Sequence, residues 1–484
     1  TSFTSFVLIG LDHDRAGARA AAQRALLITA AGGLALLGGA VLVTGAAGTT
    51  SLAALAAEPP GGTATSVGLA LMLVGAATKS AQVPFQVWLP GAMSAPTPVS
   101  AFLHSATMVK AGVILVGRLA PVFGDLGWWR PAVVTVGAVT MLVGGVGALR
   151  QHDAKLLLAH GTVSQLGLLV VLFGIGHPDV TAAAVAMLVA HALFKGALFL
   201  AVGIVDHTTG SRDIRRLAGV GRSLPLVAGL TAVAAASMAG LPPFLGFVAK
   251  EAALDTLLAV DDPWAVVAVV GIALGSVLTV AYTLRLWSGL FGPGPAGGDR
   301  DEVHHRPGAT LVAPLAVLAA ATALGGLLAT PLGDRLAVAG TSLDPAAHGH
   351  LVLWAGVHTP LVLSVAIVAA GLGLHLVLTR IGGVPAARVS GEVVFQQAYD
   401  GVLTGARRLT GIVQNGSLTA YLAVVWTVVA GAAAVAVASG ARIGDTGTVL
   451  ADDALQVGVV AITGSMALGA AVVRRRFSSV LLLG

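Results

Sequence analysis

The sequence predicts an all-α polytopic membrane protein with about 12 complete transmembrane helices and partial helices at both ends. Hydrophobic residues make up 56% of the 484 positions and charged residues only 10%, whereas about a quarter of the residues in soluble domains are charged. The apolar residues form repeated runs of about 18 or more, the length that crosses a bilayer. The basic residues are sorted between alternate loops, as expected of successive spans.

Apolar periodic runs bounded by glycine, proline and charge give the expected spans, with ends defined to about three residues. They are 22–45, 65–89, 97–119, 131–149, 155–175, 180–205, 224–249, 263–291, 309–332, 357–379, 420–440 and 453–473.

Loop charges set the orientation. One side holds most of the arginines together with Lys155, and the other holds only Arg118, Arg130, Arg335 and Arg442. The arginine-rich side is therefore expected to face the cytoplasm. Because the positive charge is sorted by membrane side, the net charge of +5 is no sign of nucleic-acid binding. The absence of cysteine excludes disulfides and thiolate iron–sulfur ligation.

The span 65–89 combines an apolar run with Lys79 and, five residues later, Pro84. Proline removes a backbone donor and frees carbonyl groups one turn back. Such groups are tolerated at membrane depth only when they are buried in protein or line a wet cavity. We therefore expect a broken helix at this point, opened toward water beside the lysine.

The spans 97–119 and 180–205 carry histidines with lysines nearby. His104 and Lys110 lie in the first, and His191 and Lys195 lie four residues apart on one face of the second. A lone buried histidine is more often a satisfied core donor, but the neighbouring lysines favour a proton relay. The depth of Lys110 cannot be fixed from the pattern, so this residue is an additional relay candidate.

The span 224–249 repeats the combination of proline and lysine. Pro242 and Pro243 precede Lys250, which is followed directly by Glu251. Two proline-interrupted spans that each carry a lysine are the pattern of repeat-built transporters with broken helices near the membrane midplane. Glu251, beside Lys250, and Asp206, at a span end, are further relay candidates, because the spans hold almost no other carboxylate.

The division between lysine and arginine indicates proton movement. Only five of the 27 basic residues are lysines, and four of these lie inside spans. A lysine at a helix centre costs about 2.5–3.5 kcal/mol on insertion scales. Arginine does not release its proton in proteins, whereas a buried lysine changes its pKa readily. The alternatives for each lysine are snorkelling to the interface and a structural ion pair.

The remaining segments carry weaker signals. His358 and His375 have no lysine nearby in the sequence, and both are expected near the membrane interfaces. Between Arg380 and Tyr421, apolar residues recur at helical spacing, which predicts an amphipathic helix lying on the cytoplasmic surface of the membrane. A helix packed on the cytoplasmic loops explains the same pattern equally well.

Three motifs carry a resemblance to a known family. The run TKSAQVPFQVWLPGAMSAPTPVSAFLHSATMVKAG, with HALFKGALFL and LPPFLGFVAKE, resembles the proton-translocating subunits of respiratory complex I and of Mrp-type multisubunit sodium/proton antiporters. IVDHTTGSRDIRRLAG and QNGSLTAYL resemble the large A subunit of the Mrp-type complexes. The short 380–421 connection points to the same resemblance, because the complex I homologue has a much longer lateral helix there.

The resemblance assigns roles to Lys79, His104, His191, Lys195 and Lys250 as the proton-carrying residues. It implies an inverted-repeat antiporter-like core, with a first half-channel repeat at 1–119 and a second at 120–291. Additional transmembrane helices then occupy 292–380, an interfacial segment 381–419, and C-terminal helices 420–484.

The function implied by the resemblance is proton translocation in a multisubunit monovalent cation (Na⁺)/H⁺ antiporter that serves pH homeostasis in a bacterial plasma membrane. Other membrane subunits, Na⁺, H⁺ and the lipid bilayer are the expected partners, and no cofactor or enzyme activity is expected. The sodium site is not identifiable from the sequence. The alternative is the distal proton-pumping subunit of NADH:quinone oxidoreductase. A scaffold that has lost transport is disfavoured because the titratable positions are present.

Both ends of the chain are expected to be internal to a longer polypeptide. TSFTSFVLIG reads as the end of a helix and SSVLLLG as the start of one. The resemblance places a glutamate that pairs with Lys79 just before Thr1, and further helices after Gly484.

Overall fold

The computed structural model describes residues 2–217, 219–293, 302–385, 391–414, 416–438 and 454–472. The described chain is almost entirely helical, which confirms the predicted all-α membrane fold. Its helices divide into two units, Thr1–Glu392 and Val393–Gly484.

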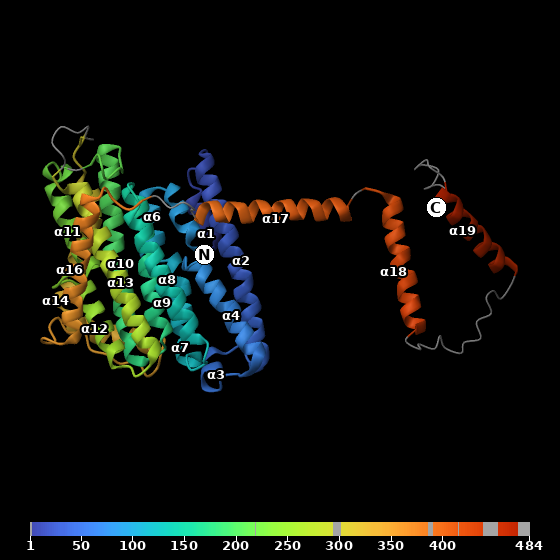
Figure 1. The fold of residues 1–484 in the computed structure, drawn as a ribbon, viewed down its shortest axis with the longest axis horizontal. Helices are drawn as coiled ribbons and strands as arrows, with labels where there is room; N and C mark the ends of the chain where they lie inside the picture. Colours follow the sequence, from blue (N-terminus) through green and yellow to red (C-terminus); the bar gives the residue numbers. More distant parts are fainter. Residues whose placement is uncertain are drawn as a thin grey trace. The chain divides into compact units, whose positions relative to one another are not determined.

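The helices of the first unit lie side by side as a bundle (Figure 1). Their bounds are α1 Ser2–Ile9, α2 Ala16–Ala47, α3 Leu52–Ala57, α4 Gly62–Lys79, α5 Trp88–Gly91, α6 Thr97–Ser105, α7 Ala111–Phe123, α8 Trp129–Leu149, α9 Ala154–Gly174, α10 Pro178–Thr209, α11 Pro225–Ala239, α12 Leu245–Ala259, α13 Pro263–Phe291, α14 Ala309–Leu327, α15 Ala329–Thr341 and α16 Thr359–Arg380. Short 3-10 turns lie at Phe85–Val87, Ala92–Ser94, Met108–Lys110 and Val220–Arg222.

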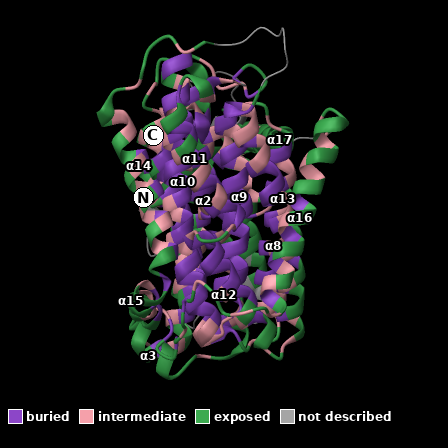
Figure 2. Ribbon diagram, turned by 90° about the vertical axis from the view of Figure 1, so that its left-hand side faces the viewer, coloured by how far each residue is buried: buried purple, intermediate pink, exposed green. Residues whose placement is uncertain are grey.

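Eight helical stretches in the described residues are long and apolar enough to cross a membrane, or nine if a bent pair counts as one span. The helix α9 lies in the centre of the first unit, where α7, α8, α10 and α13 pack around it. Its residues are buried on every side, and Figure 2 shows buried residues concentrated around α9, α10 and α12. A helix that is apolar all round belongs in such a core.

Glycine allows α8 and α9 to approach closely. A Cβ added at Gly144 would collide with the backbone nitrogen of Ser164, and one at Gly167 would collide with the carbonyl oxygen of Gly137. Because lipid is as apolar as a leucine side chain, close backbone packing of small residues is the main attraction between such helices. This contact fixes α9, the helix against which the central lysine packs.

The second unit contains α17 Gly391–Val413, α18 Leu418–Ala438 and α19 Ala454–Val472. The predicted amphipathic segment forms α17, whose exposed apolar residues include Val394, Val402 and Leu409. The chain bends by 82° between α17 and α18. The interfacial role of α17 stays a prediction. The expected C-terminal continuation and Arg442 lie outside the described residues.

Candidate functional site

The first helix break follows Lys79 directly. The helix α4 ends at this residue, and Ala81 adopts φ 49°, a left-handed conformation that costs a non-glycine residue roughly 1–2 kcal/mol. The break therefore begins several residues before Pro84. Two of its backbone groups are satisfied by protein: the Trp88 indole donates to the carbonyl oxygen of Thr78 at 2.9 Å, and the backbone N–H of Val83 donates to Thr140 Oγ1 at 2.9 Å.

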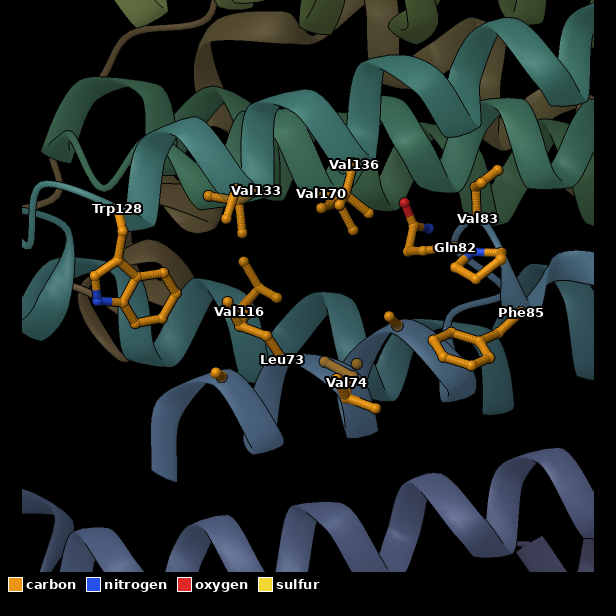
Figure 3. Close-up of a pocket in the computed structure, with 16 residues that line it drawn as sticks. Leu73, Val74, Gln82, Val83, Phe85, Val116, Trp128, Val133, Val136 and Val170 are labelled. Atoms are coloured by element: carbon orange, nitrogen blue, oxygen red, sulfur yellow. The ribbon is translucent and has the colours of Figure 1, made fainter. Parts of the chain in front are cut away.

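The expectation of a wet opening at this break is not met. The adjoining cavity of about 410 Å³ is lined by apolar side chains, with Gln82 as its one amide. Figure 3 shows Gln82 and Phe85 at one end of the cavity and Trp128 at the other. The half-buried Lys79 instead donates to Ser2 Oγ on α1 at 2.8 Å. The ammonium group therefore turns toward α1.

The second break separates α11 from α12. Gly240 has φ 81°, a conformation that favours glycine, and a Cβ there would lie 2.7 Å from the ammonium nitrogen of Lys250. Lys250 donates to the carbonyl oxygen of Ala239 at 3.2 Å, at the carbonyl end of α11. That end of a helix carries partial negative charge and stabilises a nearby cation. Pro242 and Pro243 follow Gly240, so the predicted break is confirmed.

A third interruption, which the sequence did not predict, divides the span 97–119. The helix α6 ends at Ser105, a 3-10 turn covers Met108–Lys110, and α7 begins at Ala111. His104 and Lys110 stand on either side of it. Both are buried, and neither the imidazole nitrogens of His104 nor the ammonium group of Lys110 has a hydrogen-bond partner.

The central cluster joins these two residues to His191 and Lys195 of α10. His191 is close enough to Lys110, Lys195 and His104 to experience their charges, and both of its ring nitrogens are buried without partners. Lys195, fully buried, donates to the carbonyl oxygen of Leu158 at 3.2 Å. The structure thus brings together four of the predicted residues, from α6, the 3-10 turn at Met108–Lys110 and α10.

Two residues absent from the sequence prediction complete this cluster. The ammonium nitrogen of Lys195 lies 5.9 Å from the centre of the Tyr282 ring, a cation–π distance. Gln165 donates to Thr279 Oγ1 at 3.1 Å and lies 3.4 Å from the Tyr282 hydroxyl. No composition signal distinguishes these residues from ordinary core polar groups.

Carbonyl oxygens, rather than carboxylates, accept the hydrogen bonds of Lys195 and Lys250. Lys195 and Lys250 each donate to one backbone carbonyl. A carbonyl dipole stabilises an ammonium group less than a full negative charge does, so the neutral form stays energetically close. The scarcity of carboxylates seen in the sequence is therefore consistent with lysines that change charge.

The interpretation of Lys155 as a loop charge is wrong. This lysine is only 1% exposed, and it donates to the carbonyl oxygens of Met93 and Ala95 between α5 and α6. It also lies close enough to His104 and Asp206 to affect both electrostatically. One feature of the sequence pointed to this role: Lys155 is the one lysine among loop residues whose other basic members are arginines.

Replacing Lys155 by methionine is expected to destabilise the protein. The substitution leaves the two buried carbonyl groups of Met93 and Ala95 without a donor, at roughly 1–3 kcal/mol each. Thermal denaturation of the purified complex should begin at a lower temperature. The matched control is Arg150→Met, which removes an exposed cation at the same end of the bundle. An unchanged transition in the Lys155 variant would contradict this role.

A polar cavity of about 660 Å³ opens at the arginine-rich end, and Asp206 lies in its wall. Asp213, also in the wall, accepts hydrogen bonds from the Arg215 guanidinium at 2.5 and 2.9 Å, which lower the pKa of this carboxyl. Partial burial and the charge of Arg285 lower the pKa of His152. Asp213 therefore stays ionised and His152 stays neutral at neutral pH.

The expectation that His358 lacks a titratable neighbour is also wrong. Its Nε2 lies 4.0 Å from Glu251 Oε1, at the opposite end of the bundle from the arginine-rich loops. Glu251 Oε2 accepts a hydrogen bond of 2.7 Å from Ser364 on α16. His375 lies further along α16, where it experiences the charge of Arg285.

The described residues contain no group of three or more histidines and acidic residues placed to hold a metal ion.

The fold and these buried groups define a polytopic membrane protein with interrupted helices and titratable residues in its interior. The family model described as NADH:quinone oxidoreductase/Mrp antiporter, TM, matches residues 1–275. This match covers more than half of the chain, which therefore belongs to that family.

Curated relatives agree with this assignment. The chain is 40% identical over 418 residues to the A/B subunit of a probable K(+)/H(+) antiporter of Rhizobium meliloti (strain 1021), covering 82% of this chain and 41% of the relative. It is 36% identical over 458 residues to the A subunit of the Na(+)/H(+) antiporter of Bacillus subtilis (strain 168), covering 87% and 57%. The chain thus spans about half the length of these relatives.

Solved structures are similar as well. A chain of the Mrp complex from Dietzia sp. DQ12-45-1b matches with a TM-score of 0.81 and 32% identity, over 99% of this chain and 53% of that one. A chain of the membrane-bound sulfane sulfur reductase, an archaeal respiratory membrane complex, matches with a TM-score of 0.64 and 26% identity, over 71% and 69%.

Proposed function

We propose that this chain is the proton-translocating part of an A-type subunit in a multisubunit monovalent cation/proton antiporter of a bacterial plasma membrane. The observation that carries the proposal is the buried cluster of His104, Lys110, His191 and Lys195, with Lys79 and Lys250 at the two flanking helix breaks. Such intramembrane ionisable residues are expensive, and they mark proton or ion pathways.

The proposed path enters from the arginine-rich, cytoplasmic side. Asp206, in the wall of the polar cavity, is close enough to Lys155 to affect it electrostatically, and Lys155 in turn affects His104 in the central cluster. Moving one elementary charge through 100 mV is worth about 2.3 kcal/mol. That energy equals roughly 1.7 pKa units at 1.36 kcal/mol per unit, so a moderate change in the surroundings of each lysine suffices to couple it to the membrane potential.

The partners of the chain follow from the same proposal: other membrane subunits, Na⁺ or K⁺, and H⁺. Relatives named for both sodium and potassium exchange leave the cation to be decided by assay. The complex I alternative is less favoured, because the curated relatives described above carry antiporter names.

The test is cation-dependent proton exchange in everted membrane vesicles that contain the complete complex. Respiration acidifies the vesicle lumen and quenches a pH-sensitive dye, and we expect added Na⁺ or K⁺ to reverse the quenching. Vesicles without this chain serve as the control. A different result would support the complex I alternative and refute antiport. In that case neither cation reverses the quenching, and this chain is required for NADH oxidation that a quinone-site inhibitor blocks.

A further inference from the structure

The exchange of protons with the external side needs a site beyond Lys250, and the structure offers one. We propose that Glu251 and His358 share one proton and form the external end of the proton path, with Ser364 positioning the carboxylate. This inference rests on the proposed antiporter function and adds to it the residues through which the path meets the outside.

Burial and hydrogen bonding single out Glu251. Only 8% of the residue is exposed, and its Oε1 has no hydrogen-bond partner. Its Oε2 is held by the Ser364 hydroxyl at 2.7 Å. A buried carboxylate oxygen without a donor is costly unless it binds a proton or a cation part of the time. The oxygen without a partner therefore indicates that this carboxylate binds and releases a proton or a cation.

The position of His358 supplies the second half of the site. Its Nδ1 lies 3.1 Å from the carbonyl oxygen of Gly356, which can only accept, so Nδ1 carries the hydrogen. In neutral imidazole Nε2 is then the acceptor. Nε2 and Glu251 Oε1 lie 4.0 Å apart, and two lone pairs facing each other are favourable only with a proton or a water between them. A small side-chain rotation or one water therefore lets the proton pass between the two residues.

The location of this pair suits an external end. The helix α16 runs from Thr359, next to His358, to Arg380 at the arginine-rich end, so His358 lies on the predicted external side. The side chain of His358 is 27% exposed, whereas that of Glu251 is 9% exposed. A proton can thus pass from solvent to His358 and then to Glu251, the residue that directly follows Lys250 in α12.

Few other titratable groups compete for this role. The helices α11 and α14, which pack on α12, carry none. The helix α13 contributes Tyr282 and Arg285 in its second half, and α16 contributes His375 and Arg380 near its far end. The helix α10 contributes Asp179, His191, Lys195, Asp206 and His207, of which His191 and Lys195 belong to the central cluster. Asp255, one turn beyond Glu251 on α12, is exposed.

The experiment measures Na⁺ efflux from right-side-out membrane vesicles that contain the complete complex, loaded with Na⁺ and diluted into buffers of decreasing external pH. General acid–base groups contribute about 10²–10⁴-fold to proton transfer. His358→Ala is expected to slow efflux at least about tenfold, the residual rate being carried by water. Imidazole added outside should restore the rate, which a purely structural histidine would not allow. Glu251→Gln should slow efflux without imidazole rescue.

The control is His348→Ala, which removes another histidine paired with a carboxylate, Asp179 at 2.9 Å, on the same side. It should leave efflux and its pH profile unchanged. Wild-type efflux in His358→Ala, or slow efflux that imidazole does not restore, overturns the inference. If Lys250→Met also transports normally, the proposed antiport path itself is wrong; if only His358→Ala transports normally, the external site alone is wrong.

Discussion

Replacing Lys250 by methionine is expected to abolish cation-dependent proton exchange while the complex still assembles. Methionine fills the space of the lysine stem but cannot carry a proton. The substitution removes a buried charge worth about 2.5–3.5 kcal/mol of insertion cost and one hydrogen bond to Ala239 worth roughly 1.5–3 kcal/mol. These effects have opposite signs and similar size, so the stability of the complex should change little.

The measurement is dye dequenching by Na⁺ or K⁺ in everted vesicles, with the amount of assembled complex checked by native gel. A loss of at least about a hundredfold is expected, since no other group replaces the proton carrier. The matched control is Arg335→Met, which removes a basic residue outside the spans. Normal exchange by the Lys250 variant would exclude this lysine from the path.

The sequence was sufficient to predict eight of the twelve expected spans, which match the eight helical stretches of the described residues that are long and apolar enough to cross a membrane. It also predicted the two proline-associated breaks. The length of the apolar runs and the sorting of basic residues between the two sides both follow from the bilayer, because every span crosses the same apolar medium. The buried lysines were equally visible, because an ammonium group in an apolar run has few structural explanations. The burial of Lys195 and Lys250 confirms that part of the reasoning.

The features that the sequence did not predict all depend on tertiary contacts. Lys155 lies at the start of α9 beside Asp153, where a pattern indicates a loop charge, yet carbonyl groups some 60 residues earlier bury it. The interruption before Lys110 involves no proline or glycine, and it is compensated by packing of α7 on the first break, where Val113 donates its N–H to Ser80 Oγ at 3.0 Å. The approach of His358 to Glu251 joins positions 107 residues apart, which no local periodicity encodes.

Arginine at position 79 should also stop exchange, although it preserves the positive charge. An arginine keeps its proton at every accessible pH, whereas a lysine beside a helix break can lose and regain one. The guanidinium can still donate to Ser2 Oγ, the partner of Lys79 at 2.8 Å, and it benefits equally from the carbonyl end of α4. The Lys79→Arg variant should therefore still fold. Because it keeps the positive charge, its loss of exchange separates the need for proton release from the need for charge.

The decisive comparison uses three variants in the same vesicles: Lys79→Arg, Lys79→Met and the reverse exchange Arg118→Lys, at an exposed position on the predicted external side. Both Lys79 variants should lose exchange by about a hundredfold or more, while Arg118→Lys should behave as the unmodified protein. Activity in Lys79→Arg together with its loss in Lys79→Met would mean that position 79 supplies a fixed charge. The proton would then pass this break through other groups, and Lys79 would act on the central cluster only through its electrostatic field.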